Sequence, residues 1–268
     1  MSVLTLDRYI RMRDALNQSG RAMFFALCGW HDWYAPPMPS LNYTGGYSLG
    51  NSARIANDDN SWAGVLTAAD VMSRLAPYAR PGYWNDPDLL LSVDIAGRLR
   101  MSELQSRAQF ALWSVLSAPL IISGSIGAMS QYTLATYKNK AAIDINQGGG
   151  VQGHRLVGGD LVGCAGKSVT NCTNVWGKNT SAPSVYLSSS PSPPSRAVLL
   201  LNAGAVPAAI GCNRTCLAGL GLSETSLPID VVEAWNHTTT TLTTLELPPV
   251  TLLPAGGHLL LTLTPKLK

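Results

Sequence analysis

The chain changes character at three consecutive glycines, residues 148–150. Before them, short apolar runs alternate with segments whose apolar residues recur every three or four positions, a pattern that predicts parallel strands joined by helices. After them the helical spacing disappears, and short apolar runs stand between turn-rich segments, which is typical of an antiparallel sandwich. The sequence therefore predicts an α/β region over residues 1–148 and an all-β region over residues 149–268.

The α/β region contains about four strand-and-helix units. The predicted strands are residues 22–27, 47–51, 83–91 and 120–123, and the predicted helices are residues 6–17, 62–75, a segment from Ser102 to Pro119, and 131–139. A closed (β/α)8 barrel needs eight such units, so the sequence predicts a partial TIM barrel followed by the sandwich.

Composition excludes several function classes. The formal net charge is +3 and the basic residues are dispersed, which gives no indication of nucleic-acid or anionic-membrane binding. The apolar stretch 116–122 is interrupted by Ser117 and Pro119 and is too short to cross a bilayer. Histidines and cysteines are not spaced as metal ligands, so we expect neither a metal nor a cofactor.

Other features favour a secreted protein or one in the lysosomal or vacuolar lumen, although the charged residues 1–13 do not read as a signal peptide. Cys164/Cys172 and Cys212/Cys216 are spaced for local disulfides, while four cysteines permit three pairings and Cys28 is left over. Six N-glycosylation acceptors point the same way, at Asn17, Asn42, Asn171, Asn179, Asn213 and Asn236.

Polar residues crowd into three stretches near the ends of predicted strands, at residues 24–34, 50–62 and 82–88. In the last stretch, Asp86 and Asp88 come directly before an apolar run. Charged residues beside a buried run indicate a polar site at the edge of a scaffold. An Asx-rich turn would explain this stretch equally well if it stood alone.

Five motifs occur in order along residues 9–147: ALCGW, GNSARIANDD, YWNDPDLL, FALWSVLSAPLIIS and AIDINQ. In this order they resemble the α-galactosidases and α-N-acetylgalactosaminidases of glycoside hydrolase family 27. The resemblance implies a TIM barrel with a carboxyl-terminal β-sandwich and retaining hydrolysis of terminal α-D-galactosyl groups. The implied substrates are oligosaccharides, glycolipids or glycoproteins, and the whole enzyme could be a homodimer.

The resemblance also implies roles for particular residues. Asp58, four residues after Arg54, corresponds to the acid/base catalyst, and Asp59 is the alternative because the loop is one residue shorter than usual. Both aspartates could instead cap the helix that follows. Arg54 is expected to bind sugar hydroxyls or hold a carboxylate, Trp30 to stack on the sugar, and Asp88 to bind the sugar with support from Asp86.

The sequence departs from the family pattern at several places. Gly29 replaces a sugar-binding Glu, and Ala53 replaces a Trp, so we expect a wider site and possible N-acetylgalactosamine specificity. The family's nucleophile lies in a Lys-X-Asp motif, which has no counterpart in this sequence. In the family, a cysteine at the position of Cys28 commonly pairs with a cysteine in the loop after the nucleophile, and this sequence has no such loop. We therefore expect a chain truncated before its nucleophile. The alternatives are a non-catalytic glycan-binding protein and an inactive remnant.

Overall fold

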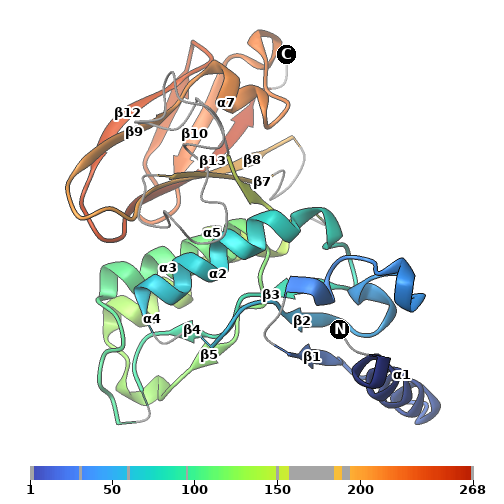
Figure 1. Cartoon of the computed structure of the whole chain (residues 1–268). Coiled ribbons are helices and arrows are strands. Elements are labelled where there is room, and N and C mark those ends of the chain that lie inside the picture. Colours follow the sequence, from blue (N-terminus) through green and yellow to red (C-terminus); the bar gives the residue numbers. More distant parts are fainter. Residues whose placement is uncertain are drawn as a thin grey trace.

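The structure is a computed structural model, and it describes residues 3–29, 32–58, 61–94, 96–148, 151–156, 184–188 and 194–266. An α/β part and a β part lie one above the other, with helices between their sheets (Figure 1). Trp30 and Asp59, two residues singled out in the sequence, lie outside the described residues, as do Cys164 and Cys172.

Short parallel strands form the sheet of the α/β part, as the sequence predicts for a partial barrel. Three of them pair in the order β1 (Ala26–Cys28), β2 (Ser52–Arg54) and β3 (Trp84–Asp86), and β4 (Leu90–Leu91) pairs with β5 (Ile122–Ser123). The register places Cys28, Arg54 and Asp86 side by side at the carboxyl ends of their strands.

Two strand predictions were wrong in detail. Residues 47–51 do not form a strand, because a 3-10 turn (Gly46–Ser48) packs there; a Cβ at Gly46 would lie 2.1 Å from the Tyr83 ring. The predicted strand at 83–91 is interrupted between β3 and β4, where Asp88 has a φ of 104°. Left-handed backbone breaks the pleat, so the segment bends instead of continuing.

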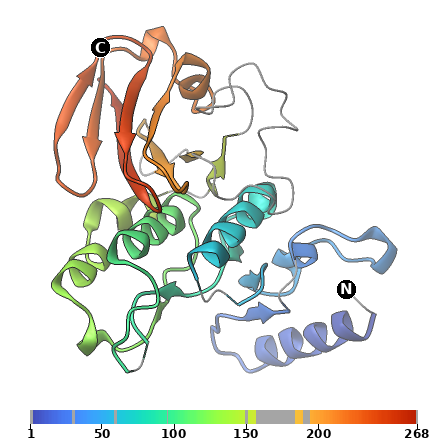
Figure 2. The same ribbon diagram turned by 60° about the vertical axis from the view of Figure 1, so that its left-hand side comes forward.

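Most helices begin at a side-chain cap that the sequence supplies. Ser61 caps α2 (Trp62–Leu75), Ser102 forms a capping box with Gln105 before α3 (Glu103–Val115), and Ser130 caps α4 (Gln131–Tyr137). Asn139 caps α5 (Lys140–Gln147), a helix the sequence analysis did not predict. Helix α1 (Val3–Gln18) lies beside β1, and the Tyr9 hydroxyl donates to the Cys28 carbonyl (Figure 2).

The β part is antiparallel, as predicted. A short helix, α7 (Arg214–Ala218), follows strand β9 (Ala208–Cys212) and carries Cys216, which forms the predicted disulfide with Cys212. The described strands form a six-stranded sheet and a two-stranded sheet. The two-stranded sheet pairs β12 (Leu247–Leu252) with β9. The six-stranded sheet has the order β11 (Thr239–Leu242), β10 (Ile229–Glu233), β13 (Gly257–Pro265), β8 (Arg196–Asn202), β7 (Ser184–Ser188) and β6 (His154–Arg155).

The six-stranded sheet is the middle layer of the molecule, because both of its faces are buried. Leu199 and Leu260 face α2 and α3, in one cluster with Trp113. Alternate residues such as Val198 and Leu261 face β9 and β12. Since one buried cluster joins the helices to this sheet, a boundary at residue 148 stays a prediction. In the described residues, no helix is long and apolar enough to cross a membrane.

A buried histidine makes the stability of this interface depend on pH. Burial, together with the nearby Arg107, lowers the pKa of His258 from 6.5 to about 4. Its Nδ1–H donates to the Gly256 carbonyl, and the ring packs edge-on against Trp235. The imidazole is therefore neutral in the folded protein above about pH 4. Between this pH and 6.5, unfolding is accompanied by uptake of a proton.

We predict that this group stabilises the fold fully above pH 6.5 and loses its contribution as the pH falls to 4, a change of about 3 kcal/mol. His258→Asn keeps a donor for Gly256 but cannot titrate in this range. Urea unfolding across this range should give a flatter pH dependence for the variant than for the wild type. Identical slopes would contradict the prediction.

Candidate functional site

The carboxyl ends of β1 to β3 form a polar rim. Cys28, Arg54 and Asp86 lie in register there, and Asp88 follows immediately after β3. In TIM barrels the catalytic residues lie at this end of the strands. The rim is therefore where the fold itself places a candidate active site.

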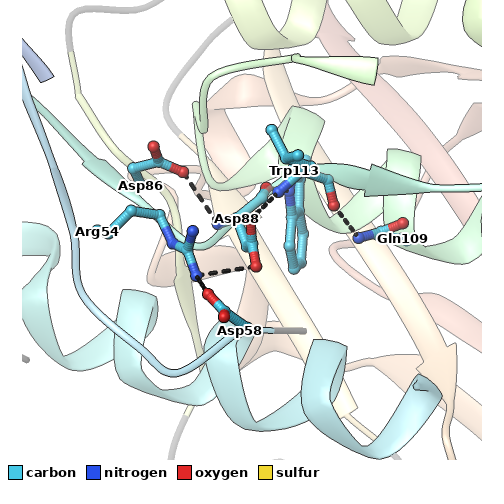
Figure 3. A network of polar contacts seen from close by, with 7 residues as sticks. Arg54, Asp58, Asp86, Asp88, Gln109 and Trp113 are labelled. Atoms are coloured by element: carbon cyan, nitrogen blue, oxygen red, sulfur yellow. Dashed lines mark hydrogen bonds and ion pairs between the residues drawn. The ribbon is translucent and has the colours of Figure 1, made fainter. Parts of the chain in front are cut away.

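Arg54 holds two of the predicted site residues together. Its Nη2 lies 3.0 Å from Asp58 Oδ1 and 2.8 Å from Asp88 Oδ2 (Figure 3). The Asp88 side chain is 8% exposed and that of Asp58 is 63% exposed. The geometry thus gives the two carboxylates different tasks, because Asp88 is fixed beneath the guanidinium while Asp58 can meet a ligand from solution.

The backbone of Asp88 adopts a conformation that other parts of the chain must hold. Its N–H donates to Asp86 Oδ1, its own Oδ1 accepts from the Leu89 N–H, and its carbonyl accepts from the Trp113 indole. A non-glycine residue at φ 104° is uncommon and persists only where its surroundings fix it. These bonds aim Oδ2 of Asp88 at Arg54.

Gln109 holds the next part of the same segment. Its Oε1 accepts from the Leu91 N–H at 2.7 Å, and its Nε2 donates to the Leu89 carbonyl at 3.0 Å. Gln109 and Trp113 are both fully buried in α3. The sequence analysis missed both residues; the available signal was Gln109 itself, a polar residue beside the apolar face of that helix.

Asp86 supports this arrangement from behind, as the sequence analysis expected. Asp86 is 9% exposed, and its Oδ1 accepts from the Asp88 backbone N–H. Burial raises the pKa of Asp86, against the Asp88 N–H hydrogen bond and the charge of Arg54, which both lower it. Asp86 therefore holds the Asp88 backbone in place and is too buried to contact a ligand at the rim directly.

Two expectations of a wider site were wrong. A Cβ at Gly29 would lie 1.9 Å from the Tyr34 hydroxyl, so the space beside this glycine is filled by Tyr34. Ala53 is fully buried in a cluster with Leu27. Because successive residues of a strand point to opposite faces, Ala53 points away from the side on which Arg54 lies and does not line the site.

Several sequence-based assignments stay predictions. Trp30 and Asp59 lie outside the described residues, so the stacking role and the choice between Asp58 and Asp59 are open. Cys28 is exposed and is not disulfide-bonded to any described residue. The structure brings Arg54, Asp58 and Asp88 together as expected, while their catalytic and sugar-binding roles stay predictions. Within the described ranges, no three ligating side chains gather to hold a metal.

Comparison with known proteins identifies the family. The family described as alpha galactosidase A matches residues 2–148. The chain belongs to this family, glycoside hydrolase family 27. Alpha-galactosidase 3 of Arabidopsis thaliana is 32% identical over 239 residues, which are 88% of this chain and 47% of that protein. Alpha-N-acetylgalactosaminidase of Mus musculus is 39% identical over 157 residues, which are 56% of this chain and 37% of that protein.

Solved structures agree on the fold. The crystal structure of alpha-galactosidase I from Mortierella vinacea matches with a TM-score of 0.70 at 22% identity, covering 99% of this chain and 64% of that chain. A putative alpha-galactosidase from Bacteroides fragilis matches with a TM-score of 0.74 at 21% identity, covering 98% and 52%. At these identities the likeness shows the fold alone. The chain spans about half the length of the curated relatives that it matches over most of its own length.

We predict that Trp113→Phe lowers the free energy of unfolding by about 1–3 kcal/mol, because the Asp88 carbonyl loses its buried donor. Trp62→Phe is the matched control, since the Trp62 indole N–H is buried without a hydrogen-bond partner among the described residues. Denaturant unfolding of both variants gives the comparison. An equal loss in the two variants would show that the hydrogen bond to Asp88 is unimportant.

Proposed function

We propose that the chain contributes part of the active site of an α-galactosidase-type retaining glycoside hydrolase that removes terminal α-D-galactosyl groups. The observation that carries the proposal is the Arg54 guanidinium between the carboxylates of Asp58 and Asp88 at the rim of the strands. Family membership supports the same chemistry, since the relatives are named alpha-galactosidases and alpha-N-acetylgalactosaminidases.

The proposed roles follow from exposure. Asp58, whose carboxylate reaches solvent, is the acid/base that protonates the leaving oxygen and later activates water. Asp88 accepts hydrogen bonds from the sugar hydroxyls, and Arg54 both donates to the sugar and orients the two carboxylates. A retaining mechanism places a nucleophilic carboxylate about 5 Å from the acid/base. No Lys-X-Asp motif supplies it in this sequence.

Galactose is the preferred sugar in this proposal. N-acetylgalactosamine would need room for its acetamido group, and the space beside Gly29 is filled by Tyr34. The Tyr34 side chain is buried, so it is not free to swing away into solvent. The proposed substrates are α-galactosides carried on oligosaccharides, glycolipids or glycoproteins.

We also propose a secreted, lysosomal or vacuolar location and a homodimeric whole enzyme. The support for the location is the Cys212–Cys216 disulfide, which persists in oxidising compartments, together with the acceptor asparagines. The proposal of a dimer rests on the family resemblance.

We predict that these 268 residues alone turn over nitrophenyl α-galactoside slowly or not at all, because they supply an acid/base without the expected nucleophile. The second protein to assay is a chimera in which the amino-terminal half of the alpha-galactosidase of Cyamopsis tetragonoloba precedes this chain. That enzyme is 30% identical over 92% of the chain. We expect the chimera to hydrolyse the nitrophenyl α-galactoside. In the chimera, Asp58→Asn should reduce kcat roughly 10²–10⁴-fold.

Two controls make this test decisive. Asp94→Asn changes a carboxylate that pairs with Arg98 instead of Arg54 and should leave turnover unchanged. Robust turnover by the chain alone, abolished by Asp58→Asn, would show that another of its carboxylates is the nucleophile. Faster hydrolysis of the α-N-acetylgalactosaminide by the chimera would contradict the galactose preference.

Galactose binding separates an enzyme part from an inactive remnant. We predict weak binding of galactose by the chain, measured by calorimetry or saturation-transfer NMR, and its loss in Arg54→Ala, since the guanidinium anchors both carboxylates. Binding without turnover in the chimera would favour the glycan-binding alternative. Absence of galactose binding by the chain together with absence of turnover by the chimera would favour the inactive remnant.

A further inference from the structure

The sandwich contains a groove that the proposed glycosidase site does not use. It has a volume of about 460 Å³ and lies between strands of the two sheets, with apolar walls that include Val231, Leu259 and Val250. Its size is within the roughly 300–1,000 Å³ typical of small-molecule sites. Val250 is 42% exposed, so the groove opens to solvent at this residue.

One wall of the groove is a buried carboxylate. Glu233, at the end of β10, is 6% exposed. Its Oε2 accepts from the backbone N–H groups of Trp235 and Asn236, whereas its Oε1 is buried and has no hydrogen-bond partner among the described residues. A buried acceptor without a donor is costly, so Glu233 lowers the stability of this wall unless the wall is held closed.

The rim of the groove carries an N-glycosylation acceptor, Asn236-His237-Thr238. Asn236 Oδ1 accepts from both the backbone N–H and the hydroxyl of Thr238, at 2.9 and 2.7 Å. Asn236 is exposed, and its Nδ2 donates to no described residue. The local turn therefore fixes the amide oxygen, while the amide nitrogen of this exposed residue makes no hydrogen bond to a described residue.

The other described acceptors lack this arrangement. Asn213 Oδ1 caps α7 by accepting from the Cys216 N–H, three residues on. Asn17 lies within the last turn of α1, where the Ser19 hydroxyl donates to the Leu16 carbonyl instead. Asn42 has left-handed backbone and is followed by the buried Tyr43.

We propose that Asn236 carries an N-linked glycan whose first sugar covers this groove. In the attachment step, Nδ2 attacks C1 of an oligosaccharide linked to a lipid diphosphate. The new N–C1 bond replaces the C1–O bond, the lipid diphosphate leaves with the electron pair, and the nitrogen loses one proton. The first sugar then places its apolar face over the apolar side chains of the groove, of which Val250 is the most exposed.

Site occupancy is the first test. The chain is directed into the secretory lumen of a eukaryotic cell by an added leader, so the result does not depend on its natural location or on the proposed activity. Peptide mass spectrometry after enzymatic deglycosylation should find Asn236 modified in the wild type and in Thr238→Ser, which keeps the acceptor, and unmodified in Thr238→Ala. An unmodified Asn236 in the wild type would overturn the proposal, whether or not Asn17, Asn42 or Asn213 carries a glycan.

Coverage of the groove is the second test. Hydrogen exchange over β11 and β12 should be slower in glycosylated Thr238→Ser than in Thr238→Ala, while β8, in the middle of its sheet, should exchange equally in both. Equal exchange over β11 and β12, with Asn236 occupied in the first variant, would overturn the placement of the sugar. Repeating the comparison in the chimera described above covers the case in which the chain alone does not fold.

Discussion

The hydrogen bond from the Trp113 indole to the Asp88 carbonyl connects the buried core to the polar rim. Trp113 belongs to the buried cluster that packs helices α2 and α3 against the six-stranded sheet. Asp88 belongs to the polar rim, where its carboxylate contacts Arg54. The position of the rim therefore depends on packing of α3 against the sandwich, because a shift of that helix would move the donor that fixes Asp88.

A strained residue at this point explains why the carboxylates can meet. In an uninterrupted strand, residues 86 and 88 would present their side chains to the same face, about two residues apart along the strand. The φ of 104° at Asp88 turns the chain, so that Asp86 bonds the Asp88 backbone and Asp88 reaches the guanidinium. Backbone strain of this kind costs on the order of 1–3 kcal/mol, and it is offset by the buried hydrogen bonds that Trp113 donates to Asp88 and Gln109 donates to Leu89.

The sequence predicts the parts of this fold that depend on local chemistry. Helix α2 has the predicted bounds because Ser61 caps it and the apolar spacing of Val65 and Met72 is regular. The segment at residues 47–51 was misjudged because its conformation depends on the approach of Tyr83 to Gly46, a contact made across 36 intervening residues. The convergence of Arg54, Asp58 and Asp88 could be predicted only through the family motifs, whereas Gln109 and the filled space at Gly29 required the tertiary structure.

The balance of charge at the rim argues for a ligand rich in hydroxyl groups. Arg54 is the cation between Asp58 and Asp88, with Asp86 close behind. An anionic ligand would add a further negative charge to this arrangement. Neutral sugar hydroxyls can donate to the carboxylates and accept from the guanidinium without adding charge. Burial raises the pKa of Asp86, while the Asp88 N–H and the charge of Arg54 lower it. The ion pair that keeps the buried Asp88 on Arg54 thus leaves the exposed Asp58 as the carboxylate that can exchange its partner for a ligand.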